Sequence, residues 1–529
     1  MRHFKHLALQ STATIALLGG LFTPAFAQVN ITEGTDQQIR TSDAADDGTA
    51  SDVVIGEPPA DDGTVPGSIT ITGNTTQPSV VLDSSNDLRI EQNATIAIAI
   101  PTSADQGETD TPTAVLLEGG ADRNYTQLGS ISITEDFTQE NTDDDPFQDG
   151  GVADGSGRTG ILISGASPFQ GNIELADSSA ILVEGNDSFG INLDNTPMMT
   201  DGLTGNLTTA GAINVAGDRS VGVNVASGVT GNLTNSGQIA VVGEDALGYA
   251  VNADIQGGFV NSGGISSNGF RSVTRIPFAG PDFDFGREDL TEEDLRQSGS
   301  ALTIGGDVSG GVFLSNFLSP QVDADGVPIL NDDGTPSLIA TGTSTILQFG
   351  GAPAVLIGRD GNPIAVGLIA QITDPNDPNF DEDLQFSFIN QGSVAASGVF
   401  DDVDATAVSI SNATLTNGFS NEGSLTAATF RAAVETELTS DSDGIARVLV
   451  LGDNAIVDQI NNSGAITASS SEATDQAFFD PDNPLAPLRV EAVAIDIGTT
   501  ASVTDLVNSG TISSIIMARD VQALSLIHI

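Results

Sequence analysis

Apolar residues alternate with polar or very small residues along most of the chain, as in the run Ala212–Ala216 (AINVA). A period of two places every second side chain on one face, which indicates β-strands rather than helices. These runs are short, and they end at Asn, Gly or Asp residues, which accept the backbone of tight corners. The pattern therefore predicts many short strands joined by turns.

The alternation is organised in a repeat of 26 residues. Gly205–Thr230 (GNLTTAGAINVAGDRSVGVNVASGVT) aligns without a gap with Gly231–Gln256 (GNLTNSGQIAVVGEDALGYAVNADIQ), and a third copy begins at Gly257. Each copy predicts about three short strands, which form one coil of a solenoid. Because one coil cannot bury its apolar side, successive coils must stack and form columns of equivalent residues. We expect Leu207, Leu233 and Phe259 to form one such column.

The same corner recurs later in the chain, at 390–392, 421–423, 462–464 and 508–510. The spacings of 31, 41 and 46 residues indicate coils with loops inserted at a corner. We therefore expect an all-β fold, a right-handed parallel β-helix that runs from about Ser68 to about Met517. About 17 coils at ~4.8 Å each set an upper length of about 80 Å. An array of β-sandwiches is the alternative, but gapless copies of only 26 residues favour the solenoid.

Two stretches interrupt the pattern, residues 270–300 and 320–384, and both are rich in Pro, Asp and Gly. We interpret them as inserted loops, which serve either recognition or surface decoration. Within the first, Thr291 and Asp294 predict the capped start of a short helix. Residues 28–67 predict an acidic lead-in or cap, with Ile39 and 52–55 as first strands. Residues 518–529 do not complete a coil in this reading, and we interpret them as a non-native or truncated tail.

The first 27 residues have the three parts of a signal peptide. A basic start precedes an apolar stretch from Leu7 to Phe22, and Ala25-Phe26-Ala27 provides small residues before a cleavage site at Gln28. A membrane anchor is the competing reading, but polar residues interrupt the stretch, which is shorter than the ~20 residues of a spanning helix. The sequence therefore predicts export.

Composition narrows the functional classes. The formal net charge is −55, which disfavours binding to nucleic acid or anionic membranes. The chain has no Cys, its only lysine is Lys5, and its histidines are His3, His6 and His528. Within the repeats this excludes serine triads, cysteine nucleophiles, zinc sites and lysine Schiff bases. We expect no enzymatic activity.

Carboxylate chemistry is the alternative that the composition leaves open, because paired acids hydrolyse glycosidic bonds. The candidates are two clusters, Asp401, Asp402 and Asp404, and Asp381, Glu382 and Asp383. Adjacent residues of a strand point to opposite faces, which disfavours joint action. The chain has no Trp and only Tyr125 and Tyr249 as tyrosines to stack on sugar rings.

Calcium is the one metal that the composition permits, since it binds carboxylate and carbonyl oxygens. The weak candidate ligands are Asp323 and Asp325 in one cluster and Asp143 and Asp145 in another. Neither cluster is followed by the Glu that closes an EF-hand loop. Solvated acidic turns explain them more simply, and we expect no cofactor.

A signal peptide followed by degenerate coils of the form G-x-L-x-N-S-G-x-I-x-V resembles the passenger domains of bacterial autotransporters (type V secretion). The resemblance covers most of the chain after residue 27. It implies that the protein is exported from a Gram-negative cell and is either displayed at the cell surface or outer membrane or released. It also implies a translocator barrel, on the same or a separate chain, as a partner. The last 150 residues still have the solenoid pattern, so we expect an N-terminal fragment or another secretion route.

These observations favour a non-catalytic adhesin or surface-structure role, with a glycan or cell-surface ligand as partner and no nucleic acid. The alternative is a secreted β-helical polysaccharide hydrolase or lyase that uses carboxylates.

Overall fold

The computed structural model describes residues 28–58, 67–73, 76–100, 111–120, 122–139, 141, 146–194, 202–277, 285–286, 289–320, 338–370, 375, 382–432, 444–473, 491–517 and 524–528. Three long parallel sheets, here called A, B and C, contain nearly all of the strands in these residues. The predicted all-β parallel β-helix is confirmed.

Sheet A consists of β1 (Gln28–Ile31), β3 (Asp52–Ile55), β6 (Leu88–Ile90), β9 (Tyr125–Gln127), β13 (Ile173–Leu175), β17 (Leu207–Thr209), β20 (Leu233–Asn235), β23 (Phe259–Asn261), β26 (Val312–Leu314), β32 (Phe388–Asn390), β36 (Phe419–Asn421), β39 (Ile456–Asn462), β42 (Ser502–Asn508), β35 (Ala413–Leu415) and β31 (Ile364–Val366). Sheet B consists of β4 (Ile69–Thr72), β7 (Ala94–Ile100), β10 (Ser130–Glu135), β14 (Ala180–Glu184), β18 (Ala212–Ala216), β21 (Gln238–Val242), β24 (Gly264–Asn268), β29 (Thr345–Phe349), β33 (Ser393–Asp401), β37 (Ser424–Ala432), β40 (Ala465–Ala473) and β43 (Thr511–Met517).

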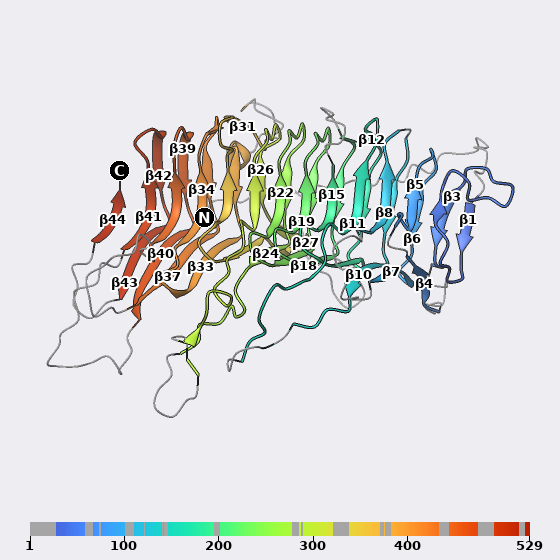
Figure 1. The fold of residues 1–529 in the computed structure, drawn as a ribbon. Coiled ribbons are helices and arrows are strands. Elements are labelled where there is room, and N and C mark those ends of the chain that lie inside the picture. Colours follow the sequence, from blue (N-terminus) through green and yellow to red (C-terminus); the bar gives the residue numbers. More distant parts are fainter. Residues whose placement is uncertain are drawn as a thin grey trace.

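Sheet C consists of β2 (Ile39–Arg40), β5 (Val80–Leu82), β8 (Thr113–Glu118), β11 (Thr159–Ser164), β15 (Phe189–Leu193), β19 (Val221–Val225), β22 (Leu247–Val251), β25 (Leu302–Ile304), β30 (Pro353–Ile357), β34 (Ala405–Ile410), β38 (Ala446–Leu451), β41 (Glu491–Ile497) and β44 (Leu524–His528). The remaining elements are the parallel pair β12 (Phe169–Gln170) and β16 (Leu203–Thr204), the antiparallel hairpin β27 (Asn316–Pro320) and β28 (Leu338–Thr343), and the 3₁₀ turn η2 (Glu382–Leu384). Figure 1 shows the coils stacked in chain order into an elongated body.

The register of neighbouring coils confirms the 26-residue repeat. Leu207 pairs with Leu233, and Leu233 pairs with Phe259, as the alignment predicts. The later corners obey the same rule, because Asn390, Asn421, Asn462 and Asn508 occupy paired positions despite their longer spacings. Extra residues between coils therefore leave the stack as loops and do not change its register.

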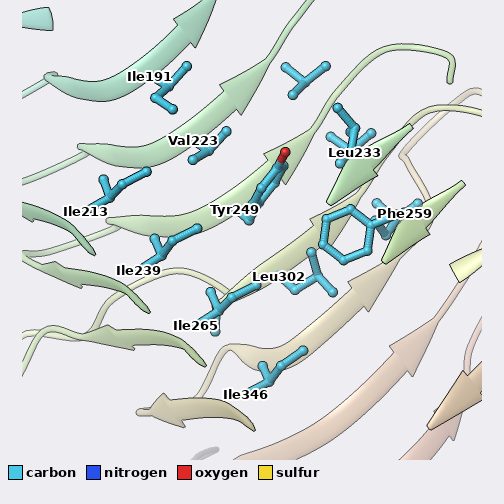
Figure 2. Close-up of a cluster of buried hydrophobic side chains, with 14 of the residues drawn as sticks. Ile191, Ile213, Val223, Leu233, Ile239, Tyr249, Phe259, Ile265, Leu302 and Ile346 are labelled. Atoms are coloured by element: carbon cyan, nitrogen blue, oxygen red, sulfur yellow. The ribbon is translucent and has the colours of Figure 1, made fainter. Parts of the chain in front are cut away.

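The interior is filled by columns of apolar side chains that run along the rod. Ile213, Ile239, Ile265 and Ile346 lie in successive strands of sheet B, opposite a column of sheet C that includes Tyr249 (Figure 2). These side chains are at most 1% exposed. Since each coil contributes one residue to each column, burial comes from stacking, which explains how the chain forms a core without disulfides.

The corner between sheets A and B is held by a ladder of asparagines, which are buried except for the last, Asn508. Asn390 donates to Asn421 (2.8 Å), Asn421 to Asn462 (2.7 Å) and Asn462 to Asn508 (2.7 Å), each from Nδ2 to Oδ1. The earlier coils repeat the contact from Asn235 to Asn261 at 2.7 Å. Each buried amide thereby finds its partner in the next coil, which makes the corner polar inside without leaving groups unpaired.

Several boundaries differ from the sequence predictions. The strands of the predicted lead-in, β1 to β3, already belong to sheets A and C, so the stack includes residues from Gln28 onward, well before Ser68. The predicted insertion 320–384 is divided, because β29 to β31 form part of a coil between the β27–β28 hairpin and the segment 367–387. Both boundaries were misplaced because the strands in these regions are short and lie in or beside acidic or Pro-rich sequence, where the alternating pattern is weak.

Two further details also differ. Leu524–His528, which we did not expect to complete a coil, pairs in parallel with β41. Thr291 donates to Asp294 Oδ2 from N (2.8 Å) and Oγ1 (3.0 Å), as the capping pattern predicts, but residues 292–295 form a turn and not a helix. Sheet B has 12 strands in the described part of the chain, below the upper estimate of 17 coils.

Candidate functional site: a face built by inserted loops

Two long connections leave the coil at the corner where sheet B passes to sheet C. Residues 136–158 link β10 to β11, and residues 269–301 link β24 to β25. In regular coils the same corner takes only four residues, such as 217–220 between β18 and β19. Together with the turn Val399–Asp404, we call the described residues of these two loops the insertion face.

The two loops contact each other although they lie more than 120 residues apart in sequence. Glu293 accepts a hydrogen bond from the backbone N of Gly150 at 2.7 Å, and Arg271 donates to the carbonyl oxygen of Gly150. The rings of Phe147 and Phe285 pack edge to face at 6.0 Å. The pKa of Arg271 is lowered mainly by burial, and the nearby positive charge of Arg296 lowers it further. The loops therefore form one continuous surface.

A small apolar cluster fixes the second loop to the solenoid. Phe270, Val399 and Phe400 are buried in it, and the rings of Phe270 and Phe400 meet at 5.1 Å. Partly buried residues pack around them, namely Ile276, Leu290, Leu295, Phe349 and Val403. Because this cluster is separate from the main core, the loop has its own packed base and is held as a defined surface.

Arginines form ion pairs with two of the three acids in the first cluster that the sequence suggests for catalysis. Arg275 forms an ion pair with Asp401, donates to the carbonyl oxygen of Val399 (2.9 Å) and lies 4.1 Å above the ring of Phe430. Asp404 accepts from the backbone N of Ile445 (2.8 Å) and faces Arg447 at 3.3 Å. These two carboxylates join separate segments of the chain.

Asp402 occupies the turn between these two acids, with a left-handed φ of 60°. Its backbone N donates to the carbonyl oxygen of Phe430 at 2.8 Å. Asp tolerates this conformation better than most residues, which explains an acid at that position. Of the second predicted cluster, Glu382 and Asp383 lie in η2, and Asp381 lies outside the described residues.

A cavity of about 360 Å³ opens beside the first loop. Its lining combines two carboxylates, two amides, a hydroxyl and two apolar side chains, from Glu135, Phe137, Thr138, Gln139, Gln148, Val152 and Glu184. Polar groups of this kind bind hydroxyl-rich ligands, while Phe137 and Val152 offer apolar contact.

One lining residue, Glu135, belongs to a buried ion pair. Glu135 and Arg158 approach to 2.7 Å, and their side chains are 5% and 1% exposed. Glu135 also accepts from the backbone N of Asp154 (2.7 Å) and Gly155 (3.0 Å), so its charge is well compensated. The sequence analysis missed this pair, since 23 positions separate the two residues and no motif links them.

The remaining sequence-based candidates are the four acids suggested for calcium and the two tyrosines. Asp143, Asp145, Asp323 and Asp325 lie outside the described residues. Within the residues that the structure does describe, no group of three acids or histidines is arranged to hold a metal ion. Tyr125 and Tyr249 are fully buried in the main core, where burial raises the pKa of both phenols, so neither ring is presented to a sugar.

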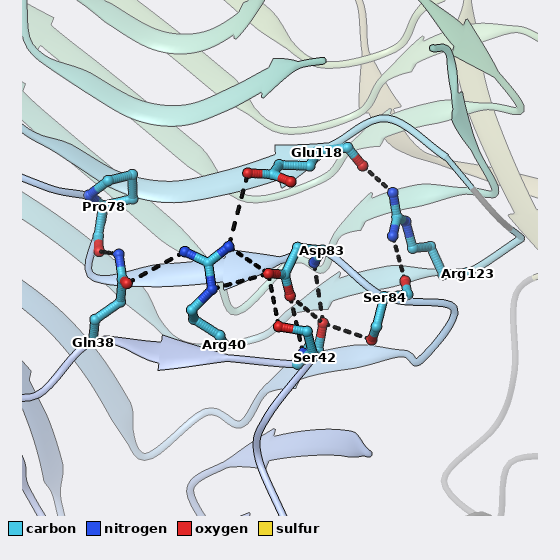
Figure 3. A network of polar contacts seen from close by, with 9 residues as sticks. Gln38, Arg40, Ser42, Pro78, Asp83, Ser84, Glu118 and Arg123 are labelled. Atoms are coloured by element: carbon cyan, nitrogen blue, oxygen red, sulfur yellow. Dashed lines mark hydrogen bonds and ion pairs between the residues drawn. The ribbon is translucent and has the colours of Figure 1, made fainter. Parts of the chain in front are cut away.

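A second polar network lies at the first coils and has a structural role (Figure 3). Asp83, whose side chain is 6% exposed, accepts from Ser42 N (2.9 Å), Ser42 Oγ (2.8 Å) and Arg40 Nε (2.9 Å). Burial alone would raise the pKa of Asp83, but the hydrogen bonds from Ser42 and Arg40 hold it below its ordinary value. The network joins β2 to β5 and thereby stabilises the start of the stack.

Among the described segments, no helix has the length and apolar character to cross a membrane. The chain matches no protein family, no curated protein and no solved structure.

Proposed function

We propose that the protein is a non-catalytic, exported β-helical rod with an adhesin or surface-structure role, displayed at the cell surface or outer membrane or released. The observation that carries the proposal is the insertion face, where loops from distant coils pack on each other beside a polar cavity. A stiff scaffold that presents packed loops is a common design of recognition proteins. The translocation partner is an outer-membrane barrel of the same or a separate chain.

The ligand class that fits best is a glycan or a cell-surface structure with many hydroxyl groups. The cavity offers amide and carboxylate groups from Gln139, Gln148 and Glu184 as hydrogen-bond partners. The net charge of −55 disfavours nucleic acid and other polyanions. Because both tyrosines are buried, Phe137 is the aromatic side chain of the cavity that would stack against the face of a sugar ring.

Binding of the purified chain to a glycan array and to whole cells tests this proposal. Gln148→Arg places a bulky cation at the cavity and should abolish saturable attachment, whereas Gln238→Arg, at an exposed position on the outer face of β21, should not. Thermal unfolding of both variants checks that the fold is intact. Equal attachment of the two variants contradicts recognition at this cavity.

The enzymatic alternative has its own readout. The chain is incubated with polysaccharides, and new reducing ends or unsaturated products are measured. Turnover that Asp401→Asn or Asp404→Asn removes, with the fold preserved, would establish a carboxylate enzyme and refute the non-catalytic role. We expect no turnover, because both carboxylates are held in ion pairs with arginines.

A further inference from the structure

The cavity beside the first loop contains one carboxylate whose charge is compensated and one whose charge is not. Glu135 is paired with Arg158 at 2.7 Å and also accepts from two backbone N–H groups. Glu184, the last residue of β14, accepts one hydrogen bond, from the backbone N of Glu135 at 3.0 Å. Arg158 donates to the backbone carbonyl oxygen of Glu184, and the Glu184 carboxylate has no ion-pair partner among the described residues. The cavity therefore retains one uncompensated negative charge.

The surroundings of this carboxylate add no positive charge. Glu184 pairs in the next coil with Ala216, which is uncharged, and none of the residues that line the cavity is basic. The loop 136–158 contains seven acidic residues, and its single base is Arg158, which already pairs with Glu135. A cavity lined by charge of one sign concentrates ligands of the opposite sign. The electrostatics therefore favour a cationic ligand.

The other lining groups match the rest of a sugar ring. Phe137 and Val152 offer apolar contact, and the exposed residues Thr138 and Gln148 have a hydroxyl and an amide with no hydrogen-bond partner among the described residues. The volume of about 360 Å³ lies near the lower end of the roughly 300–1,000 Å³ typical of small-molecule sites. The cavity therefore suits a short saccharide unit rather than a long polymer segment.

We infer that the ligand of this cavity is an amino sugar with a free, protonated amine, an inference that rests on the glycan-binding role proposed above. The ammonium group donates to the Glu184 carboxylate, and such charge-assisted hydrogen bonds are about twice as strong as neutral ones. The sugar hydroxyls bond to Thr138 and Gln148, and the apolar face of the ring lies against Phe137. N-acetylation removes the positive charge, so the cavity distinguishes the free amine from the acetylated sugar.

Calorimetric titration with two short oligosaccharides tests this discrimination. A trimer of glucosamine and a trimer of N-acetylglucosamine differ in the charge of the amino group and share the sugar backbone. The titrations are made at about pH 6, where ordinary carboxylates are ionised and the amine is protonated, and at physiological salt, which screens long-range attraction. The unmodified chain should bind the glucosamine trimer about tenfold more tightly.

Two matched substitutions separate the cavity from the general charge of the protein. Glu184→Gln removes the charge, while its amide oxygen can still accept from the backbone N of Glu135. Glu174→Gln removes the same charge at an exposed position of β13 in sheet A. Glu184→Gln should abolish the preference for the glucosamine trimer without weakening binding of the acetylated trimer, and Glu174→Gln should leave both affinities unchanged. Thermal unfolding checks that both variants keep the fold.

Three results would overturn the inference. Equal affinities of the unmodified chain for the two trimers would exclude recognition of the amine and leave the glycan-binding role standing. Equal effects of the two substitutions would show that the overall charge of −55 attracts the amine. Absence of binding by both trimers would exclude an amino-sugar site, whereas the broader proposed function fails only if the chain also attaches to no glycan on the array and to no cell.

Discussion

Replacing each buried tyrosine by phenylalanine should change stability in opposite directions. Both rings are fully buried in the main core. The hydroxyl of Tyr125 donates to Gln127 Oε1 at 2.9 Å, whereas among the described residues the hydroxyl of Tyr249 has no hydrogen-bond partner. Both substitutions remove one hydroxyl group. At Tyr125 this hydroxyl is hydrogen-bonded, whereas at Tyr249 it has no partner among the described residues.

The magnitudes follow from the cost of burying polar groups. An unpaired buried hydroxyl costs roughly 1–3 kcal/mol, so Tyr249→Phe should stabilise its coil by about 1 kcal/mol. Tyr125→Phe leaves Gln127 Oε1 without this donor, while Gln127 Nε2 keeps its bonds to Gly129 and Ala180. We expect this variant to lose roughly 1–2 kcal/mol.

Native-state hydrogen exchange is the appropriate assay, because stacked coils interact mainly with their neighbours and need not unfold as one unit. Opening free energies are compared at the amides of β22 and β9 in the two variants and the unmodified chain. Destabilisation of β22 by Tyr249→Phe, or an equal effect at both positions, would refute the packing and hydrogen-bond assignment of these two residues.

Three further substitutions test the corners and the first coils. Asn421→Leu removes two ladder bonds within a fully buried corner and should cost roughly 2–4 kcal/mol in local hydrogen exchange; a cost below 1 kcal/mol would argue against the ladder. Gly222→Ala should destabilise β19, since a Cβ there would lie 2.5 Å from both the Gly248 carbonyl oxygen and an isoleucine methyl; unchanged stability would contradict this packing. Asp83→Asn should destabilise the first coils by roughly 1–3 kcal/mol at pH 7. Because the folded pKa of Asp83 is lowered, its contribution is present above the ordinary carboxyl pKa of about 3.9 and is lost as pH falls through the folded value. Urea unfolding measured at pH 7 and at successively lower pH should therefore show the difference shrinking once the pH falls below about 3.9, and a difference that does not shrink in acid would contradict this role.

The repeat made the fold predictable where each coil has the same register. Leu207, Leu233 and Phe259 form the expected column because alternation places them inward and the 26-residue spacing aligns them. The same reasoning failed at β29 to β31, which have no gapless copy and follow acidic, Pro-rich sequence. Periodicity identifies strands only where neighbouring coils repeat it.

The insertion face could not be predicted in the same way. The contacts of Gly150 with Arg271 and Glu293 join loops whose sequences have no shared pattern. The pair of Glu135 and Arg158 is likewise produced by the corner, which brings a strand end and a loop end together. The sequence suggested Asp401 and Asp404 as candidate catalytic acids, but the structure shows that both form ion pairs with arginines.

The central claim, that the chain stacks coil on coil in parallel register, is tested most directly by distances between spin labels. The chain has no cysteine, so Thr126→Cys and Val507→Cys provide a unique labelled pair at equivalent outward positions of β9 and β42. Nine strand-to-strand steps of sheet A separate them. At about 4.8 Å a step, the account predicts a narrow distribution near 43 Å, which shortens to about 34 Å when Thr208 replaces Thr126 as the labelled site. A broad distribution, or distances that do not change by about 5 Å for each coil, would contradict the solenoid.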